Sequence, residues 1–246
     1  MFQVKICGVT SAADAALVAA AGADAVGLNF VPGSPRQLDA SQARVVAAAV
    51  PAGVLRVGVF AGATAGEIVA TARAVALDAI QLHGHLEGDR PPIDPPGLCQ
   101  ALGGLPVIRA VRLDDTRPPT DGLATARRWI AAATAAGHGP VMVIVDAAVP
   151  RGTAAGLLGG TGERADWAAL AATPRLAVPT AVAGGLTPAN VADAIRITGL
   201  GAVDTASGVE SAPGRKDREK VREFVAAARR AIERLPERSL RLTAEG

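Results

Sequence analysis

The chain has 246 residues, half of them hydrophobic, so it is long enough to bury one large core. Its net charge is only +2, and its basic residues form no stripe interleaved with aromatics, which argues against nucleic-acid binding. We see no apolar run long enough to span a membrane and no secretion signal, so we expect a cytoplasmic protein without a membrane partner.

The cysteines and the other potential metal ligands indicate neither a disulfide nor a metal site. Cys7 and Cys99 are expected to remain thiols in a reducing compartment. Cys99, in "GLCQALGG" (97–104), is typical of a small buried residue on a helix. The sequence shows neither metal-ligand spacing nor a Ser-His-Asp order, and we predict no cofactor.

Short β-rich runs alternate along the chain with alanine-rich stretches of helical spacing. The runs are residues 4–7, 25–30, 55–60, 79–84, 106–113, 141–148, 179–185 and 201–208. Eight strand–helix units in this length predict an α/β protein with a single (β/α)8 TIM barrel. An open doubly wound sheet is the alternative, but no strand leads into G-x-G-x-x-G or a Walker loop. We expect the barrel to cover residues 1–235 and residues 236–246 to form a frayed tail.

Capping residues predict where several of the helices begin. Ser11 is expected to open the first helix, and Ser41 and Thr64, or residues near them, the next two. Thr187-Pro188 places a cap and then a proline at the start of the seventh helix. The last helix is expected from about Asp217 to Leu235.

In a TIM barrel, the residues at the carboxyl ends of the strands meet over one opening. This chain places there Cys7, Asn29, Arg36, His83, Arg112, Asp146, Gly184, Gly185, Asp204, Ser207 and Gly208. Lys5 and Cys7 are two residues apart on a strand, so they share a face. If that face is the interior, Lys5 needs a carboxylate partner, for which Asp204 is a candidate by residue type alone. Taken alone, Cys7 fits an inert core residue better than a reactive one.

Asp146 follows five apolar residues, and an unpaired carboxylate so close to a core is costly unless water or a ligand solvates it. It fits either a cap for the next loop or a proton donor whose pKa is raised by apolar surroundings. Arg36, in "GSPRQ" (33–37), is either a two-point carboxylate ligand or a solvated surface arginine. His83 alone is more typical of a hydrogen-bonded structural histidine.

Glycines after the last two strands indicate a phosphate site. "AGGLTPANV" (183–191) puts Gly184 and Gly185 before a capped helix, and "ASGVESAPGRKD" (206–217) does the same after the eighth strand. Loops at these two places form the usual phosphate site of TIM barrels. "LLGGTG" (157–162) is either a lid or a further part of that site.

Together these motifs resemble phosphoribosylanthranilate isomerase, over residues 4 to about 225. The matching segments include "KICGVT" (5–10), "SPR" (34–36), "QLHG" (81–84), "VD" (145–146), "GGTG" (159–162) and "VDTASGVESAPGRKD" (203–217). The resemblance implies a (β/α)8 barrel that catalyses a cofactor-free Amadori rearrangement of N-(5-phospho-β-D-ribosyl)anthranilate in tryptophan biosynthesis.

By this resemblance, Cys7 is the general base, Asp146 the general acid and Arg36 the ligand of the anthranilate carboxylate. The loops with Gly184-Gly185 and Ser207-Gly208 match the phosphate cradle, and we add His83 and Asp204 as substrate-binding candidates. A base of this kind needs either a lowered thiol pKa or a desolvated pair. Departures such as Ala165 in place of a common phenylalanine bear on loop packing more than on the reaction type.

Other readings stay open at this point. One is another phosphate-binding barrel, such as indole-glycerol-phosphate synthase or the bifunctional histidine/tryptophan isomerase; another is a barrel that binds a ligand without catalysis. The expected partner is a small phosphoribosyl substrate, and the chain is expected to be a monomer or a homodimer.

Overall fold

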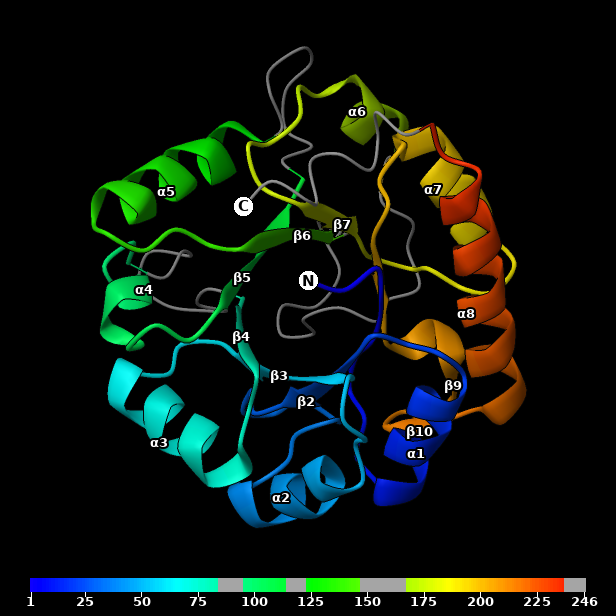
Figure 1. The fold of residues 1–246 in the computed structure, drawn as a ribbon, viewed down its shortest axis with the longest axis horizontal. Helices are drawn as coiled ribbons and strands as arrows, with labels where there is room; N and C mark the ends of the chain where they lie inside the picture. Colours follow the sequence, from blue (N-terminus) through cyan, green and yellow to red (C-terminus); the bar gives the residue numbers. More distant parts are fainter. Residues whose placement is uncertain (84–94, 114–122, 147–166, 237–246) are drawn as a thin grey trace.

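The computed structural model describes residues 1–83, 95–113, 123–146 and 167–236. In them, eight parallel strands form a closed barrel in chain order, as the alternation predicts (Figure 1). The strands are β1 (Val4–Ile6), β2 (Ala25–Asn29), β3 (Leu55–Phe60), β4 (Ala79–Leu82), β5 (Val107–Arg112), β6 (Met142–Asp146), β7 (Thr180–Val182) and β8 (Val203–Thr205). The first and last strands close the ring, with Lys5 directly opposite Asp204. The open doubly wound alternative is therefore wrong.

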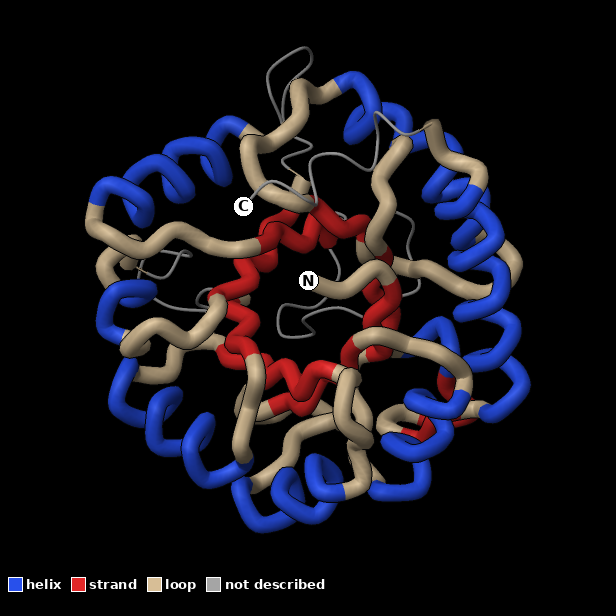
Figure 2. Tube along the Cα trace, in the orientation of Figure 1, coloured by secondary structure: helices blue, strands red, loops and turns tan. Residues whose placement is uncertain are grey.

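Helices surround the strand ring on its outside (Figure 2). They are α1 (Ala12–Ala20), α2 (Ala40–Ala48), α3 (Ala65–Val75), α4 (Leu98–Ala101), α5 (Ala124–Ala135), α6 (Trp167–Ala172), α7 (Val191–Thr198) and α8 (Arg218–Glu233). Buried apolar side chains form two clusters. The smaller one fills the barrel interior, and the larger one lies between the strands and the helices. No described helix is long and apolar enough to cross a bilayer.

Side-chain caps explain the starts of α1, α2, α3 and α8, and the start of one other helix differs from its prediction. The Ser11 and Thr64 side chains accept hydrogen bonds from the third residue of α1 and α3, as predicted. Asp39 caps α2, while Ser41 lies inside that helix and donates to the Asp39 carboxylate. The seventh helix begins at Val191, because the residues after Thr187 form a tight turn in which Asn190 N–H bonds to the Thr187 carbonyl.

The segment after β8 differs from its predicted form. The strand ends at Thr205, and Ser207–Val209 form a turn of 3-10 helix, so Ser207 and Gly208 lie beyond the strand. A two-stranded antiparallel hairpin follows, β9 (Glu210–Ala212) and β10 (Arg215–Lys216), and leads into α8. Its two short strands lack the alternating pattern from which a longer strand is predicted. The predicted tail lies almost entirely outside the described residues.

Candidate active site

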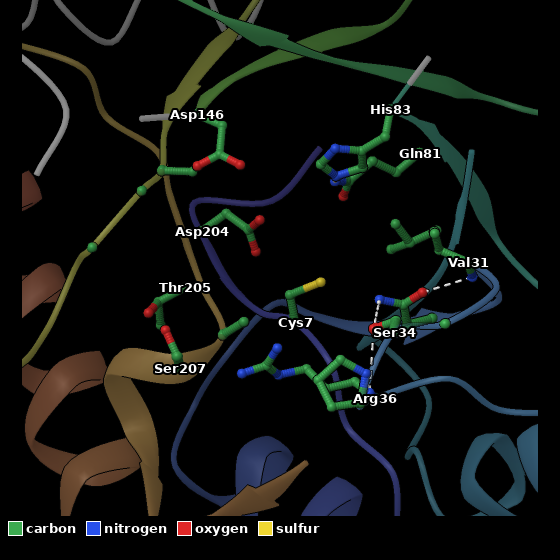
Figure 3. Close-up of a pocket in the computed structure, with 18 of the residues that line it drawn as sticks. Cys7, Val31, Ser34, Arg36, Gln81, His83, Asp146, Asp204, Thr205 and Ser207 are labelled. Atoms are coloured by element: carbon green, nitrogen blue, oxygen red, sulfur yellow. Dashed lines mark hydrogen bonds between the residues drawn. The ribbon is translucent and has the colours of Figure 1, made fainter. Parts of the chain in front are cut away.

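A cavity opens at the carboxyl ends of the barrel strands, where the sequence places its candidate site (Figure 3). It is lined by nine of the eleven residues that the sequence places there: Cys7, Asn29, Arg36, His83, Asp146, Gly184, Gly185, Asp204 and Ser207. Their strands and loops are far apart in sequence, and barrel closure brings them to one opening. Below, this space is called the mouth cavity.

Lys5 and Cys7 point into the barrel, because their neighbours Val4 and Ile6 pack in the outer core. The Lys5 ammonium is fully buried and donates to the Asp204 carboxylate over 2.9 Å, as its residue type suggested. Burial alone would lower the pKa of Lys5, but attraction by Asp204 and Cys7 outweighs it, so the pKa is raised and the amine stays charged. An ion pair therefore forms the floor beneath Cys7.

The Cys7 thiol faces the mouth cavity, and β2 leaves space for it. A methyl group added at Gly27 would lie 2.6 Å from the Cys7 sulfur, so glycine is required at this place in the wall. Burial raises the pKa of Cys7, and the positive charges of Lys5 and Lys216 offset this only in part. A thiol that acts as a base needs either a lowered pKa or a place in a desolvated pair. Because the pKa of Cys7 is raised, the structure favours the desolvated pair.

This raised pKa predicts how Cys7 reacts with iodoacetamide in a Cys99→Ala background. Only the thiolate is nucleophilic, and a raised pKa leaves less thiolate at neutral pH. The alkylation rate should therefore keep rising to a higher pH than that of a cysteine in a short peptide, as followed by mass spectrometry. A midpoint at or below that of the peptide would mean that attraction by the two lysines exceeds the effect of burial.

Asp146 ends β6 and projects into the mouth cavity from the side opposite Arg36 (Figure 3). His83 follows β4 and lines the same space, and its ring Nε2 lies 2.7 Å from the amide nitrogen of Gln81. Gln81 is almost fully buried in the barrel interior. It thus orients the His83 ring, a role the sequence analysis did not assign.

A hydrogen-bonded loop after β2 presents Arg36 to the cavity. The Asn29 side chain accepts from Val31 N–H over 2.7 Å and donates to Ser34 Oγ over 3.1 Å, and Ser34 Oγ accepts from the Arg36 amide. Arg36 is buried and makes a two-point ion pair with Glu210, over 2.8 and 2.6 Å. The reading of Arg36 as a solvated surface residue is therefore wrong.

Glu210 in turn binds Lys216, whose fully buried ammonium lies 2.8 Å from the Glu210 carboxylate. Neither residue was singled out in the sequence analysis. Both lie in the hairpin, more than 170 residues from Arg36, within the motif "SGVESAPGRK" (207–216), of which only Ser207 and Gly208 were given roles in the site. Their charges, within a loop expected to hold an anion, were the signal that could have identified them.

The glycines after β7 and β8 have different tasks. Gly184 and Gly185 have φ angles of 87° and 61°, a conformation that glycine adopts without strain, and both line the mouth cavity beside Ser207. Gly208 does not line it. A methyl group there would lie 1.8 Å from the Leu186 carbonyl oxygen, so Gly208 allows the two loop backbones to pack together.

Some predicted features lie outside the described residues, among them the loop 157–162, and the side chain of Arg112 is not described either. Cys99 is buried in α4, as predicted, and no disulfide joins it to Cys7. No group of three or more His, Cys, Asp or Glu side chains suited to a metal ion occurs in the described part of the chain.

Comparisons with known proteins identify the family of the chain. The model of the N-(5'-phosphoribosyl)anthranilate (PRA) isomerase family matches residues 4–227. The isomerase of Acidithiobacillus ferrooxidans is 42% identical over 231 residues, which are 93% of this chain and 98% of that protein.

Two crystal structures of this isomerase, one of them from Thermotoga maritima, are similar along most of the chain. The Thermotoga maritima structure is 32% identical with a TM-score of 0.74, and the alignment covers 93% of this chain and 99% of that one. The other, in complex with reduced 1-(o-carboxyphenylamino)-1-deoxyribulose 5-phosphate, is 30% identical with a TM-score of 0.70 and the same coverage. The chain belongs to the N-(5'-phosphoribosyl)anthranilate isomerase family.

Proposed function

We propose that the mouth cavity of this tryptophan-pathway isomerase converts N-(5'-phosphoribosyl)anthranilate into 1-(2-carboxyphenylamino)-1-deoxyribulose 5-phosphate, with Cys7 as general base and Asp146 as general acid. The observation that carries the proposal is the placement of these two side chains. Cys7 directly follows the first strand, Asp146 ends the sixth, and both line the same cavity (Figure 3). The reduced product analogue held by a solved relative supports the choice of substrate.

Two proton transfers account for the residue types. Asp146 donates a proton to the furanose ring oxygen, and the ring opens to an iminium ion between the sugar C1′ and the anthranilate nitrogen. The positive nitrogen acidifies the C2′ hydrogen, which the Cys7 thiolate removes. The C2′–H electron pair forms the C1′–C2′ double bond, and the iminium electrons return to nitrogen. The resulting enolamine tautomerises to the ketone.

The surroundings of the base suit this step. A desolvated thiolate is a stronger base than a solvated one, and the Cys7 pKa is raised by burial. The positive charges of Lys5 and Lys216 stabilise the Cys7 thiolate and offset part of this rise in its pKa. The ion pair with Asp204 holds the Lys5 ammonium in the barrel core, below the Cys7 sulfur.

Arg36 and the glycine loops would hold the two ends of the substrate. Arg36 faces the cavity and would bind the anthranilate carboxylate, an interaction that suits a guanidinium. Gly184, Gly185 and Ser207 line another part of the cavity, where backbone N–H groups can approach a phosphate closely. His83, oriented by Gln81, and Asp204 complete the wall toward the sugar.

A fluorescence assay tests the proposal. The unstable substrate is generated in place from anthranilate and phosphoribosyl pyrophosphate by a transferase, and its fluorescence is followed after the purified protein is added. We expect turnover in the absence of any nucleotide, and no loss of activity when EDTA is added once the substrate has formed. Folded wild-type protein that leaves the fluorescence unchanged would refute the proposed reaction.

A further inference from the structure

Lys216 is a buried ammonium close to the mouth cavity but outside its lining. Its side chain has no exposed surface, and its three N–H donors reach three oxygens. These are the Cys7 carbonyl at 2.7 Å, the Ala206 carbonyl at 3.1 Å and the Glu210 carboxylate at 2.8 Å. A lysine held in this way cannot bind the substrate itself, and in the proposed reaction its charge acts only on the Cys7 thiolate.

Glu210 connects this charge to Arg36. Its carboxylate takes two hydrogen bonds from Arg36, at Nε and Nη2, and one from Lys216. Burial alone would raise the pKa of Glu210, but the bonds and charges of Arg36 and Lys216 outweigh it, so the pKa is lowered and the carboxylate is ionised. Arg36, Glu210 and Lys216 therefore form a charged triad in which one carboxylate pairs with two cations.

The charge balance of the triad depends on Lys216. Arg36 and Glu210 alone would be a neutral pair, and a neutral pair attracts a ligand carboxylate weakly. With Lys216, the triad carries one net positive charge, and its only member on the cavity wall is Arg36. Glu210 uses Nε and Nη2 of the guanidinium, so Nη1 takes no part in this pair.

We propose that Lys216 is a positioning residue for the carboxylate subsite: it neutralises Glu210, so that Glu210 holds Arg36 in place without cancelling the charge that Arg36 offers to the ligand. This inference rests on the proposed function, which assigns the anthranilate carboxylate to Arg36. The inference adds to the proposed site a residue that does not touch the ligand. It also requires that the three buried groups of the triad together carry one net positive charge.

Binding of two ligands to four proteins tests the inference. The ligands are reduced 1-(o-carboxyphenylamino)-1-deoxyribulose 5-phosphate and its counterpart without the aromatic carboxylate, and their dissociation constants are measured by calorimetry. The proteins are the wild type, Lys216→Met, the double variant Lys216→Met with Glu210→Gln, and Lys220→Met. Lys220 is the matched control, because its ammonium bonds to the backbone carbonyl of Glu210 and the residue is exposed.

We expect Lys216→Met to reduce the preference for the carboxylated ligand about tenfold, since a partner of a buried charge is removed. Lys220→Met should keep the preference. The double variant should recover most of it, because removal of both charges leaves Arg36 as the net positive charge, with a glutamine oxygen still able to accept from the guanidinium. If Lys216 only stabilised the fold, the additional Glu210→Gln substitution would not restore the preference for the carboxylated ligand.

The possible failures are distinguishable. A wild type without any preference for the carboxylated ligand would contradict the role of Arg36 in the proposed function. A wild type with the preference, together with a folded Lys216→Met protein that keeps it, would overturn the inference about Lys216. If Lys216→Met alone does not fold, the double variant decides, and a folded double variant without the preference also overturns the inference.

Discussion

Replacement of Cys7 by serine, or of Asp146 by asparagine, is expected to lower kcat by about a hundredfold to ten-thousandfold, the usual contribution of one positioned acid or base. Serine keeps nearly the shape of cysteine, but its hydroxyl is far too weakly acidic to supply the anionic base. Asparagine keeps the shape of aspartate but has no carboxyl proton to give. Steady-state measurement with the fluorescence assay gives both numbers.

The control for these variants is Cys99→Ser. Cys99 is the second thiol of the chain and lies buried in α4, on the helical shell and away from the mouth cavity. Its substitution should leave kcat near the wild-type value. If folded Cys7→Ser or Asp146→Asn proteins stay within tenfold of the wild type, the proposed pair of proton-transfer residues is wrong.

The second large effect concerns stability. Lys5→Met is expected to reduce the free energy of unfolding by about 3–5 kcal/mol, because it leaves the Asp204 carboxylate buried beside β1 without its cation. The lysine side chain has no exposed surface and the aspartate side chain is only 10% exposed, so water cannot replace the lost partner fully. Urea unfolding followed by circular dichroism measures the loss.

Two comparisons show whether the loss comes from the unpaired charge. Arg196→Met removes a cation from the pair with Asp193, whose side chains are 71% and 60% exposed, and should cost less than about 0.5 kcal/mol. Lys5→Met combined with Asp204→Leu removes both charges and should recover most of the stability. A Lys5→Met protein no less stable than Arg196→Met would contradict the importance of the buried pair.

The barrel was predictable because its signal is local and repeated. Each strand is a short β-rich run, most of these runs are bounded by glycine or proline, and eight of them occur in one chain. Side-chain alternation also predicted that Lys5 and Cys7 share a face, and the rule that strand ends meet at one opening selected Asp146 and His83. The end of the eighth strand was placed too late, because the motif "ASGVE" (206–210) continues its apolar character into a turn.

The triad could not be predicted in the same way. Arg36 and Glu210 are 174 positions apart, and only the closed barrel brings the loop after β2 to the hairpin after β8. A pattern within a short window carries no information about such a contact. The direction in which the pKa of Cys7 is shifted could not be predicted either, since it depends on the balance between burial and the charges of two lysines on different elements.

Ring closure between β1 and β8 has a consequence for synthesis on the ribosome. The strand with Lys5 emerges first, whereas its partner Asp204 and the hairpin that encloses the Cys7 backbone emerge almost 200 residues later. Until then the first strand has an open edge and an unpaired ammonium, and contacts of such long range form slowly. The nascent chain thus carries the Cys7 thiol without its partners from β8 and the hairpin through most of translation, and the mouth cavity is completed only when the last quarter of the polypeptide has been made.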